Sequence, residues 1–178
     1  MKVAKRVGES TLELVTGDIT KQETGAIVNA ANKRLAPGGG VAGAIHQAAG
    51  PGLWEECRGL GGCETGEAKI TSGHNLAAKH VIHTVGPVYQ GSPDDPVLLG
   101  DCYRNSLELA RDNGIKSISF PAISAGIFGY PMAEAARVSL KVVRDFLLKN
   151  SSVKLVRFVL FKPADFMIYR QALEQIVP

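Results

Sequence analysis

Short runs of apolar residues alternate along the chain with longer segments whose apolar residues recur at helical spacing. Residues 11–15 (TLELV) alternate between apolar and polar side chains, the period-two pattern of a strand with one buried face. Residues 131–149 repeat apolar side chains every three to four positions, behind a proline suited to a first helical turn. The same reasoning predicts further strands over residues 26–30, 68–71, 81–85, 115–120 and 154–161, and further helices over residues 43–49, 51–57, 95–114 and from 163 onward.

The alternation of strands and helices predicts an α/β domain with a largely parallel central sheet. No internal repeat, low-complexity tract or linker interrupts the pattern, so a single domain is expected over residues 1–178. In sheets of this kind, ligands bind beyond the carboxyl ends of the strands. The loops over residues 16–20, 29–43 and 122–130 are therefore the expected places for function.

Composition narrows the class of protein. The 178 residues are 45% hydrophobic and 21% charged, which suits a globular domain with a sizeable core. No apolar run approaches the ~18 residues that cross a bilayer, and the first ten residues lack the apolar stretch of a signal peptide. The three cysteines are an odd number with no disulfide framework, so a cytoplasmic protein without a membrane partner is expected. The net charge of +3 is scattered, which gives a nucleic-acid partner only weak support.

The glycine-rich stretch GGGVAGAI, residues 38–45, offers two interpretations. Gly38, Gly40 and Gly43 satisfy the dinucleotide-binding pattern G-x-G-x-x-G. That pattern should directly follow a strand, but the preceding strand ends near Ala30, so the dinucleotide-binding interpretation fails on context. What remains is either a tight structural loop or bare backbone N–H groups that approach an anion at a helix start.

A second glycine loop, PAISAGIFGYP over residues 121–131, follows another predicted strand. Ser124 lacks the G-x-S-x-G frame of a hydrolase nucleophile, and no Gly-Lys-Ser/Thr of a P-loop follows. Two glycine loops at strand ends suggest a diphosphate held from both sides.

Three polar residues lie at or just past the ends of predicted strands. Asp18, in TGDIT, could accept from an amino group such as that of a base, or serve as the N-cap of a short helix. Asn29 and Asn32, in VNAAN, could orient ribose hydroxyls or a water, or could tie down a loop, the role favoured for Asn29.

The four histidines do not predict a metal site. His80 and His83 are three apart on one strand, so their side chains point to opposite faces. His46 and His74 have no cysteine or carboxylate at ligand spacing.

Five ordered motifs over nearly the whole chain resemble the macrodomain family. They are TGDIT, VNAAN, GGGVAGAIHQAAG, TGEAKITSGHNLAAKHVIHTVGP and SAGIFGYP, and the long central motif is similar to the MacroD branch. The resemblance implies a three-layer α/β/α fold with a mixed sheet that binds ADP-ribose in a cleft at the strand ends. It further implies removal of ADP-ribose from acidic side chains of proteins, or deacetylation of O-acetyl-ADP-ribose, without a metal or cofactor.

The resemblance also assigns ligand-binding residues. Asp18, with the backbone of Ile19, would meet the adenine amino group, and Phe161 would pack on adenine. Asn32 would contact the distal ribose. The diphosphate would lie between Gly38, Gly39, Gly40 and Val41 on one side and Ser124, Ala125, Gly126, Ile127 and Phe128 on the other, with Phe128 limiting the distal ribose.

Ala42 departs from the pattern GGGVDGAIH of many MacroD-type hydrolases, whose aspartate helps to position or activate the attacking water. Macrodomains with GGGVAG resemble this chain and are still hydrolases, in which the substrate phosphate and the asparagine equivalent to Asn32 are thought to hold that water. Asn32 is therefore the expected catalytic residue. His46, four residues after Ala42, is either a base in the cleft or a packed side chain. The alternatives to hydrolysis are a non-catalytic ADP-ribose reader and an RNA-binding or ribonuclease-regulating protein.

Overall fold

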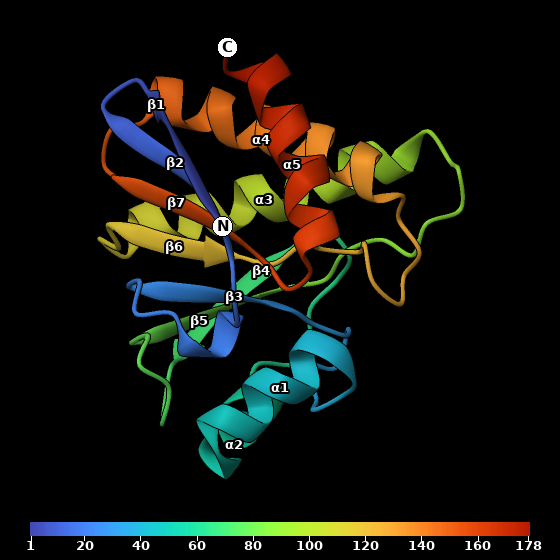
Figure 1. Ribbon diagram of the computed structural model, residues 1–178. Coiled ribbons are helices and arrows are strands. Elements are labelled where there is room, and N and C mark those ends of the chain that lie inside the picture. Colours follow the sequence, from blue (N-terminus) through green and yellow to red (C-terminus); the bar gives the residue numbers. More distant parts are fainter.

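The computed structural model describes residues 1–178 and has a seven-stranded sheet between two layers of helices (Figure 1). The strands are β1 (Lys2–Val7), β2 (Ser10–Thr16), β3 (Ala26–Ala30), β4 (Ala68–Ser72), β5 (His80–Thr84), β6 (Ser117–Phe120) and β7 (Leu155–Leu160). The helices are α1 (Gly40–Ala49), α2 (Pro51–Arg58), α3 (Asp94–Asp112), α4 (Met132–Lys149) and α5 (Pro163–Ile176), with one 3-10 turn, η1 (Ile19–Lys21). The α/β/α architecture expected from the sequence is confirmed.

The sheet is mixed and largely parallel. Its strands lie in the order β1-β2-β7-β6-β3-β5-β4, and the outermost pairs, β1 with β2 and β5 with β4, are antiparallel. The inner pairs are all parallel, so β2, β7, β6, β3 and β5 end at the same edge. Because β6 lies between β7 and β3, the loops that follow these three strands are neighbours in space.

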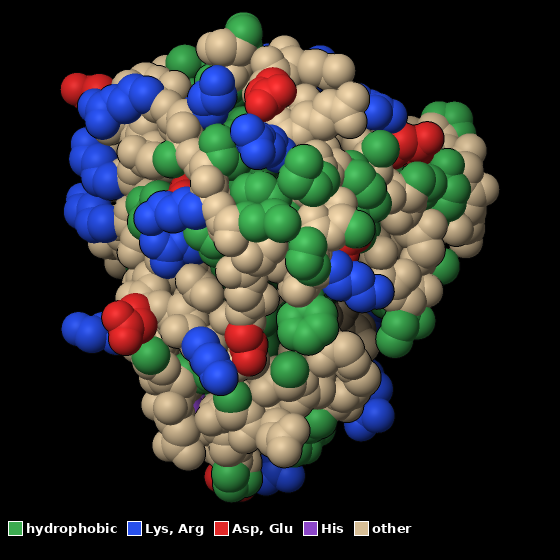
Figure 2. All heavy atoms as spheres, in the orientation of Figure 1, with side chains coloured by type: hydrophobic (Ala, Val, Ile, Leu, Met, Phe, Trp, Pro, Cys, Tyr) green, Lys and Arg blue, Asp and Glu red, His purple; other side chains and the backbone are tan.

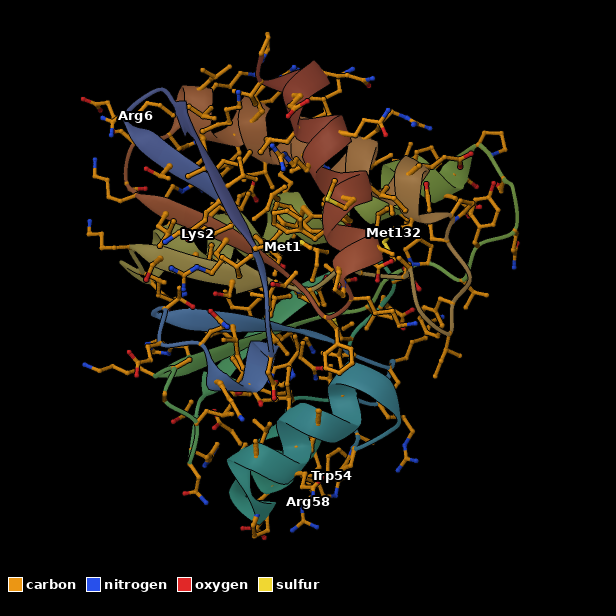
Figure 3. The ribbon with its side chains drawn as sticks, in the orientation of Figure 1. Met1, Lys2, Arg6, Trp54, Arg58 and Met132 are labelled. Atoms are coloured by element: carbon orange, nitrogen blue, oxygen red, sulfur yellow. The ribbon has the colours of Figure 1, made fainter.

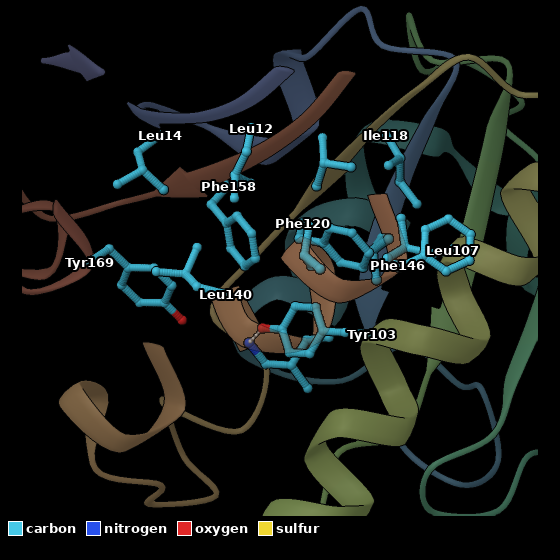
Figure 4. Packing of buried hydrophobic residues seen from close by; sticks show 14 of the residues in the cluster. Leu12, Leu14, Tyr103, Leu107, Ile118, Phe120, Leu140, Phe146, Phe158 and Tyr169 are labelled. Carbon is cyan, nitrogen blue, oxygen red and sulfur yellow. Dashed lines mark hydrogen bonds between the residues drawn. The ribbon is translucent and has the colours of Figure 1, made fainter. Parts of the chain in front are cut away.

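The larger core lies under α3, α4 and α5, where an aromatic cluster crosses from the sheet to the helices (Figure 4). The Tyr103 ring of α3 lies 4.9 Å from that of Phe120 on β6, and Phe158 on β7 lies 5.5 Å from Tyr169 on α5. The buried Tyr103 hydroxyl donates to the Pro121 carbonyl and accepts from the Ile123 N–H, both at 3.1 Å. The core thereby fixes the start of the second glycine loop.

The smaller core lies on the other face of the sheet, under α1 and α2 (Figure 1). Ile45 of α1 and Leu53 of α2 are fully buried together with Ile27 of β3 and Val81 of β5. This apolar contact holds α1 against the sheet, with the start of the helix near the end of β3.

The first strand was not predicted. Lys2, Ala4 and Arg6 of β1, the first strand of the sheet, are exposed, so the apolar alternation that identifies a strand is weak; Lys2 and Arg6 are labelled in Figure 3. Lys2 pairs with the buried Glu13 of β2 at 2.8 Å. The missed signal was Gly8, whose φ of +59° closes the hairpin to β2.

The predicted helices all form, with small shifts in their bounds. α1 begins at Gly40 rather than at residue 43, and α3 ends at Asp112, just before Gly114 with its φ of +68°. None of the helices combines the length and the hydropathy that a membrane span requires.

Candidate active site

A cleft of about 560 Å³ opens where β3, β6 and β7 end. That volume lies within the ~300–1,000 Å³ of typical small-molecule sites. Figure 2 shows hydrophobic side chains gathered between α5 above and α1 below, on the face toward the viewer. The cleft is lined by Ala30, Ala31, Asn32, Gly38, Gly39, Gly40, Val41, Ala42, Pro121, Ala122, Ser124, Ala125, Gly126, Ile127, Phe128, Met132, Val159, Leu160, Phe161, Lys162 and Asp165.

The first glycine loop forms one wall and leads directly into α1. Gly39 is the N-cap, and Gly40 has a φ of +57°, a left-handed conformation that favours glycine. The first N–H groups of a helix have no partner within it, and the helix dipole makes this end positive. No acidic side chain lies in the first turn of α1. This wall therefore presents unpaired donors and positive potential to the cleft.

The second glycine loop forms the opposite wall. Ser124 has a φ of +65°, and its buried hydroxyl has no hydrogen-bond partner. The loop is closed by the Tyr130 N–H, which donates to the Ser124 carbonyl at 2.9 Å. Gly86, after β5, makes room for this turn, because a Cβ carbon there would overlap the Ser124 hydroxyl. The left-handed turn therefore depends on a bare backbone at position 86.

The two glycine loops approach each other across the cleft. A Cβ carbon at Gly39 would lie 3.9 Å from Cδ1 of Ile127. The Ile127 side chain is 87% exposed and that of Phe161, at the end of β7, is 82% exposed. Exposed apolar side chains at the rim of a concave site provide surface for a flat or apolar part of a ligand.

Asn32 lines the cleft and also braces its loop. Its Nδ2 donates to the Ala36 carbonyl at 2.9 Å, and its Oδ1 accepts from the Ala36 N–H at 3.0 Å. An amide has two donor hydrogens and two acceptor lone pairs, so one of each remains free for a ligand or water. The loop-tying role that the sequence favoured for Asn29 thus belongs to Asn32.

Asp18 and Ile19 lie beside the cleft and do not line it. Gly17, the preceding residue, donates to the carbonyl of the cleft residue Leu160 at 3.1 Å. Asp18 is the N-cap of η1: its Oδ1 accepts from the Thr20 hydroxyl at 2.7 Å and from the Thr20 N–H at 2.9 Å. These two bonds, the hydroxyl first, lower the pKa of Asp18. The second carboxylate oxygen of Asp18 has no hydrogen bond. The contact of Asp18 with adenine stays a prediction.

His46 does not line the cleft, so it cannot act there as the base that was one of its two expected roles. Its side chain, on the sheet-facing side of α1, is only 6% exposed, and neither ring nitrogen has a hydrogen-bond partner. Burial lowers the pKa of His46. The helical face that carries residue 46 packs on the sheet, as the burial of Ile45 and Ala49 also shows. His46 is a packed side chain.

The buried Asn29 contacts a second histidine in the sheet. Its Nδ2 donates to Nδ1 of His83 at 3.1 Å, so the other ring nitrogen carries the hydrogen and faces the Thr71 hydroxyl at 2.9 Å. Burial, followed by the charge of nearby His46, lowers the pKa of His83 to about 3. His83 is therefore neutral and structural. No group of three His, Cys, Asp or Glu side chains lies close enough together to hold a metal ion.

Several cleft residues were missed by sequence reasoning. Lys162 and Asp165 begin α5 beside Phe161, and Met132 (labelled in Figure 3) begins α4. The rule that ligands bind beyond strand ends could have included Lys162 and Asp165, since they directly follow β7. Met132 carries no such signal, because its place depends on the angle at which α4 leaves its loop.

Comparison with known proteins agrees with this geometry. The family model described as Macro domain matches residues 28–139. The chain is 53% identical over 165 residues to the Xenopus laevis protein named ADP-ribose glycohydrolase MACROD2, covering 91% of this chain and 40% of that protein. It is 50% identical over 169 residues to a Cronobacter turicensis protein named O-acetyl-ADP-ribose deacetylase, covering 92% of this chain and 96% of that one.

A solved structure is similar over nearly the full length. The Oceanobacillus iheyensis macrodomain, determined with ADP, superimposes with a TM-score of 0.96 at 45% identity, covering 99% of this chain and 97% of that one. The Macro match spans more than half of the chain and includes both glycine loops. The chain belongs to the macro domain family.

Proposed function

We propose that the chain binds ADP-ribose in this cleft and hydrolyses mono-ADP-ribose esters on protein glutamate or aspartate, or the ester of O-acetyl-ADP-ribose. The observation that carries the proposal is that the two glycine loops face each other across one cleft, with a helix N-terminus in one of them. Backbone N–H groups and a helix start bind anionic phosphate oxygens. The names of the Xenopus and Cronobacter relatives support the same substrate class.

The two ends of the cleft suit the two ends of ADP-ribose. The exposed Phe161 ring and the apolar Val159 and Leu160 form one end, where a base can stack. Asn32 and Phe128 lie on the walls formed by the two loops. We place the distal ribose, with the bond to be broken, beside these two residues.

The proposed reaction uses a positioned water. Water adds across the ester bond, so that free ADP-ribose and a carboxylic acid leave. Ala42 brings no carboxylate to the α1 wall, and the one acidic residue that lines the cleft, Asp165, lies beside Phe161. General-base help typically contributes a factor of about 10²–10⁴. In this chain the water would depend on the free hydrogen-bonding capacity of Asn32 and on the phosphate oxygens of the substrate.

A non-catalytic ADP-ribose reader is the second candidate, and Ala42 is the observation that favours it. A cleft with no carboxylate near the distal ribose could hold the ligand without activating water. The two candidates agree on binding and differ only in turnover.

The test compares binding with turnover on defined substrates. Isothermal calorimetry with ADP-ribose should give a micromolar dissociation constant. Incubation with proteins mono-ADP-ribosylated on glutamate should release ADP-ribose, as followed by mass spectrometry. A serine-linked protein should remain modified, because an alkoxide is a poorer leaving group than a carboxylate. Binding without release from the ester over hours would select the reader.

The proposed partners are mono-ADP-ribosylated proteins, and the proposed location is the cytoplasm. The three cysteines are unpaired and buried, which is ordinary in a reducing compartment. Cell fractionation with an antibody against the chain tests the location.

A further inference from the structure

A second, smaller pocket lies on the far side of the loop that forms one wall of the cleft. It has a volume of about 250 Å³ and is formed by the loop before α3 and the first turns of α3 and α4. Two hydrogen bonds join it to the cleft wall: Tyr89 N–H donates to the Phe128 carbonyl, and Tyr130 N–H donates to the Ser124 carbonyl, both at 2.9 Å. In Figure 1 this loop before α3 runs beside the loop before α4, at the right.

Aromatic rings and carboxylates converge on this pocket. The rings of Tyr89 and Tyr130 lie 4.9 Å apart at 59°. Asp95 is 4% exposed, and its Oδ2 accepts from the N–H groups of Gln90 and Ser92, both at 3.0 Å, which ties the loop to α3. Glu134 is exposed and accepts from the Tyr89 hydroxyl at 3.5 Å. The pocket thus has a rigid floor and an acidic rim.

The pocket holds hydrogen-bonding capacity that the chain does not use. Neither Asp95 nor Glu134 forms an ion pair with a lysine, arginine or histidine, although the chain has nine such pairs elsewhere. Tyr130 is 4% exposed, and its hydroxyl has no hydrogen-bond partner within the protein. Tyr130 lines the same pocket as Asp95 and Glu134, and burial, followed by the charges of these two carboxylates, raises its pKa. A carboxylate and a phenol with no ion pair and with free hydrogen-bonding capacity, gathered in one pocket, form a site that favours a cationic donor.

We propose that this pocket binds the guanidinium or ammonium group of a basic side chain in the ADP-ribosylated protein, close to its modified residue. This proposal rests on the proposed function. The volume suits one side chain rather than a nucleotide, since nucleotide sites are larger. The tyrosine rings can stack on a planar guanidinium, and Glu134 can accept its hydrogen bonds. Arg137, the one cation that lines the pocket, is exposed and is in none of the nine ion pairs, so it can turn toward solvent.

The position relative to the cleft explains why a protein-bound cation fits better than a free one. Phe128, whose carbonyl receives the Tyr89 N–H, lies on the wall where the distal ribose is placed. A peptide that leaves the distal ribose at this wall passes the mouth of the pocket within a few residues. The tether raises the effective concentration of the side chain at the pocket.

The test uses peptides with one ADP-ribosylated glutamate and a single arginine at successive positions on either side, each matched by a peptide with uncharged citrulline. At one or two positions arginine should lower KM about tenfold with kcat unchanged, because the added contact is the same in the ground and transition states. Added salt should shrink the difference. Glu134→Gln and Tyr130→Phe should reduce it to threefold or less, whereas Glu9→Gln, in the β1–β2 turn, should leave it intact.

The affinity for free ADP-ribose separates the two proposals. It should be the same in wild type and all three variants, since none of these side chains lines the cleft. Equal KM for every arginine and citrulline pair, with hydrolysis intact, overturns the basic-side-chain proposal alone. If the peptides bind without being hydrolysed, the dissociation constants of each arginine and citrulline pair are compared instead. Equal dissociation constants then also overturn the basic-side-chain proposal. Failure to bind ADP-ribose overturns both. Tight binding of free agmatine would identify a free cation as the ligand and also overturn the proposal.

Discussion

Gly43, in the first turn of α1, lies so close to the carbonyl oxygen of Gly38 that a Cβ carbon at position 43 would overlap this oxygen. The helix and the preceding loop therefore fit together only if residue 43 has no side chain. This contact fixes the direction of the backbone N–H groups between the two glycines, which face the proposed diphosphate.

Gly43→Ala should displace the loop over residues 38–42. A hydrogen bond to a charged group contributes about 1.5–3 kcal/mol, so loss of one such bond weakens ADP-ribose binding about tenfold or more. Calorimetry measures the affinity. Gly59→Ala is the matched control, since position 59 has ordinary space, with the nearest atom at 3.5 Å. Equal affinity in both variants would contradict the role of the loop.

Asp18→Ala should weaken ADP-ribose binding at least tenfold, because one charge-assisted bond to the adenine amino group is worth about 1.5–3 kcal/mol. The change also removes the N-cap of η1, which costs about 1 kcal/mol of stability. Asp18→Asn keeps a good capping residue and separates the two effects in a thermal unfolding experiment. Unchanged affinity of the folded Asp18→Ala protein would move adenine elsewhere, and Asp165→Ala would then be the next variant to measure.

Asn32→Ala should lower kcat about a hundredfold while the dissociation constant of ADP-ribose changes less than about tenfold, because a group that positions water acts mainly in the transition state. Single-turnover release from a glutamate-linked substrate gives the rate, and calorimetry gives the affinity. Asn32→Asp keeps the acceptor for the Ala36 N–H and reports on the loop. Equal losses in rate and affinity would assign Asn32 to bracing alone.

His83 should make the protein less stable as the pH falls below about 6.5. In the native state its pKa is lowered to about 3, so between these values the unfolded chain binds one more proton than the folded one. The free energy of unfolding should therefore fall by at most about 1.4 kcal/mol per pH unit for this histidine, and the lowered pKa of His46 adds in the same direction. Urea unfolding between about pH 7.5 and 5.5 isolates the histidines, because carboxylates take up protons at lower pH.

His83→Gln removes the titrating group and keeps a polar side chain between Asn29 and Thr71. The variant should be less stable at neutral pH, with a shallower decline on acidification. A decline as steep as that of the wild type would assign the effect to other groups.

Much of this architecture could be predicted from patterns, for reasons that particular residues show. β3 is buried on both faces, so it reads as a nearly continuous apolar run, and Gly114 ends α3 as expected. β1 escaped prediction because an edge strand keeps lysine and arginine on its outer face, which erases the apolar alternation. The carboxyl-end rule correctly placed both glycine loops at one cleft.

Side-chain partners could not be predicted in the same way. Asn29 lies within β3 and Asn32 follows its end, and this difference of three residues decides which of them braces the loop. His46 could have faced either the cleft or the sheet, since the residues of one helical turn point in all directions around the helix axis. Such choices depend on tertiary contacts that no local pattern contains.

The place of β7 in the sheet has a consequence for how this chain can be divided. Residues 28–139 contain both glycine loops, but β7, which pairs with β6 on one side and β2 on the other, comes from residues 155–160. A fragment restricted to residues 28–139 would expose β6 as an unpaired edge, open to association with other chains, and would lack the Phe161 end of the cleft. ADP-ribose raises the melting temperature only of a folded form that binds it. The size of this rise therefore depends on whether β7 and Phe161 are in place as well as on the affinity of the cleft.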